Sequence, residues 1–316
     1  MKGHRSHQHH WRSRMAENIG FLGPGLMGKG IVKNLLGKGY KVMIHAHREG
    51  LKLDDLLGAG ATVTKSLTEL GQKNTTIVLC VPSSKEVEAV ILGTPGLLQS
   101  MREGSVLIDL STSLPASTRM LAARLRERKI EMLDAPMTGT PVHANAGELN
   151  LMVGGEKAVY EKCLPVLRAI AKNIIYVGAT SHGNIVKLIN NFLGQLSNAG
   201  IAEVLPLAAK AGVDLKALYD VVRVSGGNSR VFEGSVPAIC RRDFTVTFHL
   251  KLAHKDMGYM SAVGREYNVP LPMVNSLLNV LDLAKASGLG DENTNALVKL
   301  WEKVAQVEVR RDGVGQ

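Results

Sequence analysis

The sequence predicts an α/β domain with a mostly parallel, doubly wound sheet, followed by an all-helical domain. Three observations predict this fold. Short apolar runs alternate with amphipathic stretches from Asn18 to Gly178, a glycine-rich loop joins the first run to the first helical stretch, and no strand-like run follows Thr180. We therefore divide the 316-residue chain into an α/β domain over 15–180 and a helical domain over 181–316.

The expected elements of the first domain alternate along its whole length. The predicted strands are the apolar runs Ile19–Leu22, Val42–His45, Thr76–Val81, Val106–Leu110, Glu131–Ala135, Leu149–Val153 and Ile174–Val177. The predicted helices, with apolar residues at helical spacing, include Gly28–Leu36, Lys85–Leu92, Pro115–Arg128 and Lys157–Ala171. The second domain is expected to begin with one long helix from His182, kinked or ended at Pro206, and to continue in shorter helices to about Val304.

The composition is ordinary for a globular protein with a sizeable core, with 45% hydrophobic and 21% charged residues. The apolar runs are too short to span a membrane, so we expect no membrane partner. The three widely spaced cysteines, Cys80, Cys163 and Cys240, match neither a metal site nor a disulfide framework. This usage favours a reducing cytoplasm, and we expect no metal.

Part of the formal net charge of +10 lies at the N-terminus. Residues 1–14 are basic and histidine-rich, and no apolar core of a signal peptide follows them. We expect a tag or a disordered extension, with Met15 as a natural start and a short targeting arm as the alternative. Basic clusters at 124–129 and 240–242 are expected to be solvated faces. Because aromatic residues are not interleaved with the charge, we expect no nucleic-acid partner.

A glycine-rich loop follows the first predicted strand. In "IGFLGPGLMGKGIVKNLL", three glycines have the G-x-G-x-x-G spacing of a dinucleotide site. The first glycine allows a tight turn, the second admits a pyrophosphate close to the backbone, and the third lets the helix pack on the strand. The helix N-terminus then offers unpaired N–H groups to the phosphates. We expect the loop residues that contact the cofactor to be Gly23, Pro24, Gly25, Leu26, Met27 and Gly28.

The end of the second predicted strand, "VMIHAHREG", bears on the choice between NADP(H) and NAD(H). An NAD site usually places Asp or Glu there to bind the ribose 2′-hydroxyl. This chain instead has Arg48, with His47 before it, and an arginine pairs with a 2′-phosphate. The pattern favours NADP(H), while Glu49 keeps NAD(H) possible.

A lysine and two asparagines interrupt the apolar segment "NIVKLINNFL". Lys187 and Asn191 are one helical turn apart on the same face. A lysine in apolar surroundings loses hydration, so its pKa falls and it becomes usable for proton transfer near neutrality. The alternative is a lysine whose stem lies along the core while its ammonium reaches water.

Three further stretches carry polar or glycine residues, and two of them follow predicted strands, where an α/β enzyme presents its ligand site. Thr112 follows one strand, and the Thr138-Gly139-Thr140 turn follows another, with hydroxyls and successive N–H groups that can hold an anionic oxygen. Phe248, Lys255 and Asp256 lie on or beside a later helix. Taken singly, these features also fit a helix cap, a turn and a solvated ion pair.

Together and in this order, the motifs resemble the β-hydroxyacid dehydrogenase family, which includes 3-hydroxyisobutyrate dehydrogenase and tartronate semialdehyde reductase. The resemblance spans about residues 17–305 and rests on "GFLGPGLMG", "DLST", "DAPMTG", "GNIVKLINN" and "LAHKD…VPLPM". It implies an N-terminal Rossmann domain, a helical C-terminal domain, and a homodimer or homotetramer built through the helices. It also implies an NAD(P)-dependent enzyme that interconverts a short 3-hydroxy acid and its semialdehyde.

The resemblance implies a role for each candidate residue. Lys187 matches the catalytic acid/base, and Asn191 matches a substrate ligand with Asn190 as its neighbour. The further residues matched to the substrate site are Thr138, Gly139, Thr140, Phe248 and Asp256. The further residues assigned to the cofactor are Val81, Pro82, Thr112 and Lys255.

The departures from the family pattern bear on the reaction and the substrate. Family members commonly show S-G-G where this chain has Thr138-Gly139-Thr140, so the added bulk and hydroxyl indicate a substrate with an unusual group. His143 is expected to be an ordinary surface histidine, with substrate contact as the alternative. The glutamate found two turns after the lysine in decarboxylating phosphogluconate enzymes is Gly194 here, which argues against decarboxylation. Imine reductases generally lack the lysine, so Lys187 argues against them. They are kept as an alternative, as is a non-catalytic cofactor-binding module.

Overall fold

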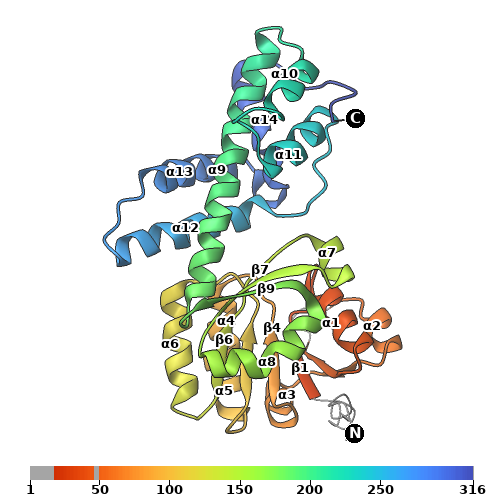
Figure 1. The fold of residues 1–316 in the computed structure, drawn as a ribbon, viewed down its shortest axis with the longest axis vertical. Helices are drawn as coiled ribbons and strands as arrows, with labels where there is room; N and C mark the ends of the chain where they lie inside the picture. Colours follow the sequence, from red (N-terminus) through yellow and green to blue (C-terminus); the bar gives the residue numbers. More distant parts are fainter. Residues whose placement is uncertain (1–17, 46–49, 316) are drawn as a thin grey trace, which may run out of the picture. The chain divides into compact units, whose positions relative to one another are not determined.

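The computed structural model describes residues 18–45 and 50–315 of the chain (Figure 1). These residues form two compact units, which we call unit 1 and unit 2. Unit 1 ends at Asn184 and unit 2 begins at Ile185, whereas the sequence predicts a boundary after residue 180.

Within the described residues, unit 1 builds one nine-stranded sheet. Its strands are β1 (Asn18–Leu22), β2 (Lys41–His45), β3 (Thr62–Thr64), β4 (Thr76–Leu79), β5 (Val106–Asp109), β6 (Glu131–Asp134), β7 (Met137–Thr138), β8 (Leu149–Gly154) and β9 (Ala171–Gly178). The order is β3-β2-β1-β4-β5-β6-β8-β7, and β9 pairs with β8. The pairs from β3 to β6 are parallel, and β8 is antiparallel to β6 and β7. The chain order reverses between β1 and β4, which is where open α/β sheets bind ligands.

Helices cover both faces of this sheet (Figure 1). The helices of unit 1 are α1 (Gly28–Gly37), α2 (Asp54–Gly58), α3 (Leu67–Lys73), α4 (Ser84–Leu92), α5 (Leu97–Ser100), α6 (Pro115–Arg126), α7 (Pro141–Ala146) and α8 (Lys157–Ile170). Successive side chains of a strand point to opposite faces. On β4, Ile77 and Leu79 join one hydrophobic core while Val78 joins the other. The doubly wound, mostly parallel fold class is therefore confirmed.

Unit 2 is helical. Helix α9 (His182–Lys210) starts in unit 1 and continues into unit 2. The other elements are α10 (Leu215–Val222), α11 (Arg230–Cys240), α12 (Leu250–Glu266), α13 (Pro272–Ala286), the short 3₁₀ turns η1 (Leu289–Asp291) and η2 (Thr294–Leu297), and α14 (Val298–Ala305). Pro206 stands inside α9, so the alternative in which it ends this helix is wrong. The core of unit 2 includes Leu205, Val236 and Met257, which are fully buried.

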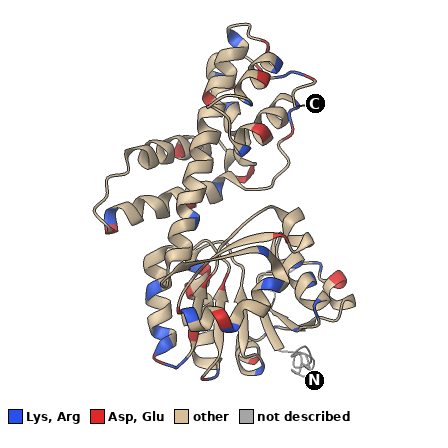
Figure 2. Ribbon diagram, in the orientation of Figure 1, with Lys and Arg blue, Asp and Glu red and all other residues tan. Residues whose placement is uncertain are grey.

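Acidic and basic residues are interleaved over both units (Figure 2). In the cluster at 124–129, Lys129 pairs with Glu103 at 2.7 Å on the exposed surface, as expected of a solvated face. The cluster at 240–242 differs from this expectation, because Arg242 pairs with the buried carboxylate of Glu302 and stacks over Phe244. Sequence alone does not reveal that partner, which lies 60 residues away. Among the described residues, no helix is both long and apolar enough to cross a membrane.

Candidate active site

The glycine-rich loop after β1 has the geometry that dinucleotide binding requires. Gly23 has a φ of +94°, and a Cβ there would lie 2.1 Å from the Cys80 carbonyl oxygen. A Cβ on Gly28 would lie 2.2 Å from the Gly23 carbonyl oxygen, so α1 begins tightly against the loop. At Gly25, by contrast, a Cβ would meet nothing within 4 Å. The loop thus combines a tight turn, a close-packed helix start and one open backbone position for a pyrophosphate.

The first turn of α1 suits the phosphates of the same ligand. Met27 occupies the N-cap position, and no side chain caps the helix there. The N–H groups of a helix start that lack a side-chain cap are suited to an anion. Pro24 is buried and Leu26 is exposed in the same loop. The described residues therefore fit a dinucleotide, and the individual contacts stay predictions.

The other predicted cofactor residues of unit 1 follow neighbouring strands. Val81 and Pro82 come after β4, and Thr112 comes after β5. The Val81 N–H donates to Ser111 Oγ at 3.0 Å, which ties the ends of these two strands together. Both ends lie at the carboxyl edge of the sheet, on the side where the glycine loop also emerges.

The predicted partners of a 2′-phosphate, His47 and Arg48, lie outside the described residues, as does Glu49. The choice between NADP(H) and NAD(H) therefore rests on the sequence pattern at those positions.

The Thr138-Gly139-Thr140 turn is held on both flanks. Thr138 Oγ1 accepts a hydrogen bond from Asn150 Nδ2 at 3.1 Å, so its own hydrogen stays available to an anionic oxygen. Gly139 has a φ of +127°, which favours glycine. On the other flank, the Thr140 N–H donates to His143 Nδ1 at 3.2 Å. The run of successive N–H groups expected from the sequence is therefore shorter, because His143 takes the last one.

Two residues that the sequence does not single out hold the start of α9. Asp134, at the end of β6, is fully buried and accepts from the backbone N–H groups of Ser181 at 2.8 Å and Asn184 at 2.9 Å. Asn184 in turn accepts from the Ser113 N–H at 2.8 Å and donates to Thr118 Oγ1 at 3.2 Å. Asp134 is the first residue of "DAPMTG" and Asn184 is the first residue of "NIVKLINN". The sequence alone does not indicate that this aspartate is buried or that it caps the helix.

The pKa of Asp134 is raised to about 7, mainly by burial and to a smaller extent by the nearby carboxylate of Asp109. The two N–H groups that it accepts from oppose this shift, because they stabilise the ionised form. The carboxylate at this helix start therefore titrates in the physiological range.

Unit 2 gathers a second group of predicted site residues around Lys187. The pKa of Lys187 is lowered to about 8; burial is the main cause, the Asp256 carboxylate opposes the shift, and the Lys255 ammonium contributes to it. Asn191 Nδ2 donates to Asp256 Oδ2 at 2.6 Å. Lys255 Nζ lies 3.1 Å from Asp256 Oδ1 and 5.0 Å from the centroid of the Tyr259 ring. Helices α9 and α12 thus supply a lysine of lowered pKa beside a fixed amide and a buried ion pair.

The structure tests the alternative interpretation of Lys255 and Asp256 and places the other predicted residues of this group. Asp256 is 1% exposed and the Lys255 side chain 16%, so the pair is not a solvated surface pair. Asn190 is exposed, and its Nδ2 donates to Asn191 Oδ1 at 3.3 Å. Phe248 lies just before α12, where its N–H donates to Asn293 Oδ1 at 3.1 Å and its ring packs against the core of unit 2.

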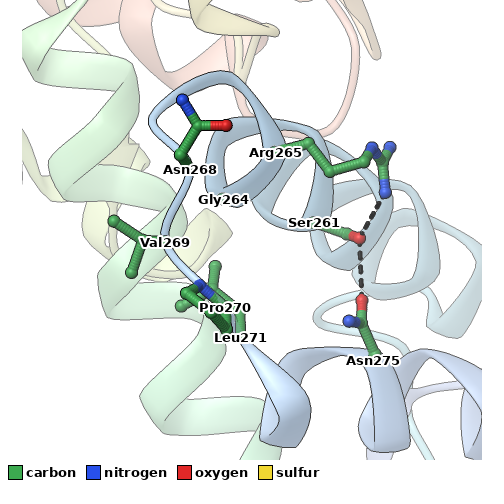
Figure 3. Close-up of a pocket in the computed structure, with 8 residues that line it drawn as sticks. All are labelled: Ser261, Gly264, Arg265, Asn268, Val269, Pro270, Leu271 and Asn275. Carbon is green, nitrogen blue, oxygen red and sulfur yellow. Dashed lines mark hydrogen bonds between the residues drawn. The ribbon is translucent and has the colours of Figure 1, made fainter.

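A pocket of about 340 Å³ lies elsewhere in unit 2, at the connection between α12 and α13 (Figure 3). Arg265 Nη1 donates to Ser261 Oγ, and Ser261 Oγ donates to Asn275 Oδ1, each at 2.8 Å. The residues that line it are Ser261, Gly264, Arg265, Asn268, Val269, Pro270, Leu271 and Asn275, and none of them is a predicted site residue.

Comparisons with known proteins identify both halves of the chain. Residues 18–178 match the family described as the NAD binding domain of 6-phosphogluconate dehydrogenase. Residues 181–301 match the family described as NAD-binding of NADP-dependent 3-hydroxyisobutyrate dehydrogenase.

Individual relatives agree with these matches over nearly their whole length. The chain is 35% identical to 2-(hydroxymethyl)glutarate dehydrogenase of Eubacterium barkeri, over 92% of this chain and 97% of the relative. It is 34% identical to L-threonate dehydrogenase of Cupriavidus necator, over 91% and 97%. The crystal structure of 3-hydroxyisobutyrate dehydrogenase from Salmonella typhimurium is similar with a TM-score of 0.81 and 30% identity, over 90% of this chain and 99% of that one.

An imine reductase of Myxococcus stipitatus, at 21% identity and a TM-score of 0.60, shares the fold alone. The predicted family and the predicted class of enzyme are therefore confirmed. By its motifs, its fold and these relatives, this chain belongs to the β-hydroxyacid dehydrogenase family of nicotinamide-dependent oxidoreductases.

Proposed function

We propose that this enzyme interconverts a short 3-hydroxy acid and its semialdehyde, with Lys187 as the general acid/base. The observation that carries the proposal is the lowered pKa of Lys187, about 8, in a setting where Asn191, Asp256 and Lys255 are fixed by contacts with one another. A general acid/base works best when its pKa lies near the working pH. An ordinary solvated lysine, with a pKa of 10.5, is almost wholly protonated at neutrality.

A bound nicotinamide cofactor would supply the hydride acceptor for oxidation of the carbinol carbon and the hydride donor for reduction of the aldehyde carbon. In oxidation, neutral Lys187 Nζ removes the hydroxyl proton as the carbonyl forms. In reduction, protonated Lys187 Nζ donates that proton to the developing alkoxide. Asn191, whose amide is held by Asp256, orients the reacting oxygen toward the lysine.

The substrate carboxylate is proposed to bind at the turn after β7. The Thr138 hydroxyl is oriented by Asn150, and it donates to the carboxylate together with the Gly139 N–H, since His143 accepts the N–H of Thr140. Holding the carboxylate fixes the carbon that exchanges hydride, and such positioning supplies much of the rate of a two-substrate reaction.

The relatives support the choice of substrate class. One is named for 2-(hydroxymethyl)glutarate, one for L-threonate and one for 3-hydroxyisobutyrate, and each name denotes a small hydroxy acid. For the cofactor we propose a preference for NADP(H), supported by the sequence at His47 and Arg48, with NAD(H) as the second choice.

We also propose that the enzyme works in the cytoplasm as a homodimer or homotetramer, with residues 181–316 as the substrate and assembly domain. The three cysteines, odd in number and widely spaced in the sequence, support the first part, and the family resemblance supports the second.

Replacing Lys187 tests the proposal directly. We expect Lys187→Met to lower kcat by about 10²–10⁴-fold, the usual contribution of general acid/base catalysis, while the Kd for NADPH stays unchanged. Lys187→Arg keeps a cation that does not deprotonate near neutrality, so it should be equally inactive in oxidation. Lys216→Met removes a lysine from an exposed pair with Asp220 and serves as the matched control.

The assay follows the absorbance of the reduced cofactor with each of the three hydroxy acids and with NADP⁺ or NAD⁺. A Lys187→Met enzyme that keeps a tenth or more of the wild-type rate contradicts the acid/base role. Tight cofactor binding without turnover of any hydroxy acid or semialdehyde points to the non-catalytic module, and turnover of cyclic imines alone points to an imine reductase.

A further inference from the structure

His143 is held in one orientation over the turn that is proposed to bind the substrate carboxylate. Its Nδ1 lies 3.2 Å from the Thr140 backbone nitrogen and 2.8 Å from Thr140 Oγ1. A Cβ added to Gly139 would lie 3.2 Å from His143 Cβ and 3.6 Å from its Cγ. The imidazole therefore packs on the glycine of the turn and is anchored to the residue that follows that glycine.

These contacts determine which ring nitrogen carries the hydrogen. A backbone N–H is only a donor, so His143 Nδ1, which faces the Thr140 N–H, must accept. The Thr140 hydroxyl is then also a donor to this nitrogen. A neutral imidazole that accepts at Nδ1 carries its hydrogen at Nε2. His143 therefore presents an N–H donor at Nε2, and because the residue is exposed, this donor is accessible to a ligand.

The Thr140 side chain adds a second contact to the one that its backbone N–H makes with the ring. Thr140 stands where members of the family commonly have glycine, which has no hydroxyl. Helix α7 begins directly after it, with Pro141 in its first turn and His143 at the third helical position. The departure from the family pattern and the fixed histidine are thus one structural feature.

We propose that His143 is a specificity-determining residue that selects hydroxy acids with a second carboxylate, to which its Nε2–H donates. The inference rests on the proposed function, in which the first carboxylate binds at the Thr138-Gly139-Thr140 turn. A hydrogen bond to an ionised carboxylate is stronger than one to a neutral group, so a single added donor distinguishes a dicarboxylate from a monocarboxylate. No step of hydride or proton transfer involves His143.

Three compounds that differ only in one arm test this selectivity. 3-Hydroxyisobutyrate has a hydroxymethyl group, a carboxylate and a methyl arm on one carbon. 2-(Hydroxymethyl)glutarate has the same centre with an arm that ends in a second carboxylate, and 2-(hydroxymethyl)pentanoate has an uncharged propyl arm. We expect the wild-type kcat/KM to be about 10- to 100-fold higher for the dicarboxylate than for the propyl compound, mainly through KM.

Two substitutions separate the two ring nitrogens. His143→Asn keeps an acceptor at the Nδ1 position for Thr140 but removes the outer donor, so the preference for the dicarboxylate should fall at least tenfold. His143→Gln keeps an amide N–H at the Nε2 position but loses the acceptor that Thr140 contacts, so it should retain more of the preference than His143→Asn. The measured quantity is the ratio of kcat/KM for the dicarboxylate to kcat/KM for the propyl compound, because any general effect on the turn changes both values alike, and the melting temperature reports that the variants are folded.

The outcomes are distinct from those that test the proposed function. Equal wild-type activity on the dicarboxylate and the propyl compound overturns the selectivity while leaving the dehydrogenase reaction intact. Equal loss of the preference in His143→Asn and His143→Gln overturns the assignment to Nε2. A Lys187→Met enzyme that keeps its activity on the three compounds overturns the acid/base role and leaves the selectivity measured with the His143 variants standing.

Discussion

The pKa of Lys187 makes a quantitative prediction about the pH dependence of the reaction. With a pKa of about 8 in place of 10.5, the neutral fraction of Lys187 at pH 7 rises from about 0.03% to about 9%, roughly 300-fold. Because oxidation needs the neutral amine, kcat for oxidation should rise tenfold per pH unit below pH 8 and level off above it. Because reduction needs the ammonium, its kcat should be level below pH 8 and fall above it.

Two substitutions near Lys187 should move this pH profile in opposite directions. The Asp256 carboxylate raises the pKa of Lys187 and the Lys255 ammonium lowers it. Asp256→Asn should therefore shift the profile to lower pH and Lys255→Met to higher pH, each by about one unit. The assay is the initial rate at saturating cofactor, with a substrate deuterated at the carbinol carbon to verify that hydride transfer limits the rate.

Shifts in the same direction for both variants would refute the assignment of the titrating group. So would a limb near pH 8 that persists in the residual activity of Lys187→Met. A level profile from pH 6 to 10 in the wild type would show that the lysine keeps one protonation state throughout catalysis.

Two further predictions concern unit 1. Gly25→Ala places a methyl group in open space, so the melting temperature should change little while the Kd for NADPH rises at least tenfold, measured by fluorescence titration beside Gly37→Ala as a control. The second concerns Asp134, whose raised pKa of about 7 means that the native state holds its proton more tightly than the unfolded chain, with a pKa of 3.8. Its stabilising contribution is present below pH 4 and is lost as the pH rises to 7, by about 4 kcal/mol at most. Urea unfolding should show this loss in the wild type and not in Asp134→Asn, and equal slopes in both proteins would contradict it.

The sequence predicts the main strands well because they are buried on both faces. Strands β1, β4 and β5 are short and mostly apolar, and such runs are characteristic of a parallel sheet covered by helices. The elements that sequence reasoning omits are short. Strand β7 has two residues, β3 has three and α5 has four, too few to show a helical or strand period.

In the candidate site, some contacts join residues that are close in the sequence and others join residues that are far apart. The contact of Thr140 with His143 spans three residues and follows a helix-start pattern, so a sequence can in principle reveal it. The contact of Asn191 with Asp256 spans 65 residues, and no spacing rule connects the two. The sequence motifs indicate that both belong to one site only through the family resemblance.

The capping of α9 by Asp134 shows why such long-range contacts matter for the proposed catalysis. Asp134 stands 50 residues before Asn184, yet it holds the first turn of the helix that carries Lys187 three residues later. A carboxylate is the group suited to that position, because it accepts two backbone N–H groups at once and its charge favours a helix N-terminus. Burial raises the cost of keeping it ionised, so its pKa approaches neutrality. The lysine and the aspartate thus have opposite charges and opposite shifts for the same physical reason, since removing water disfavours the charged form of each.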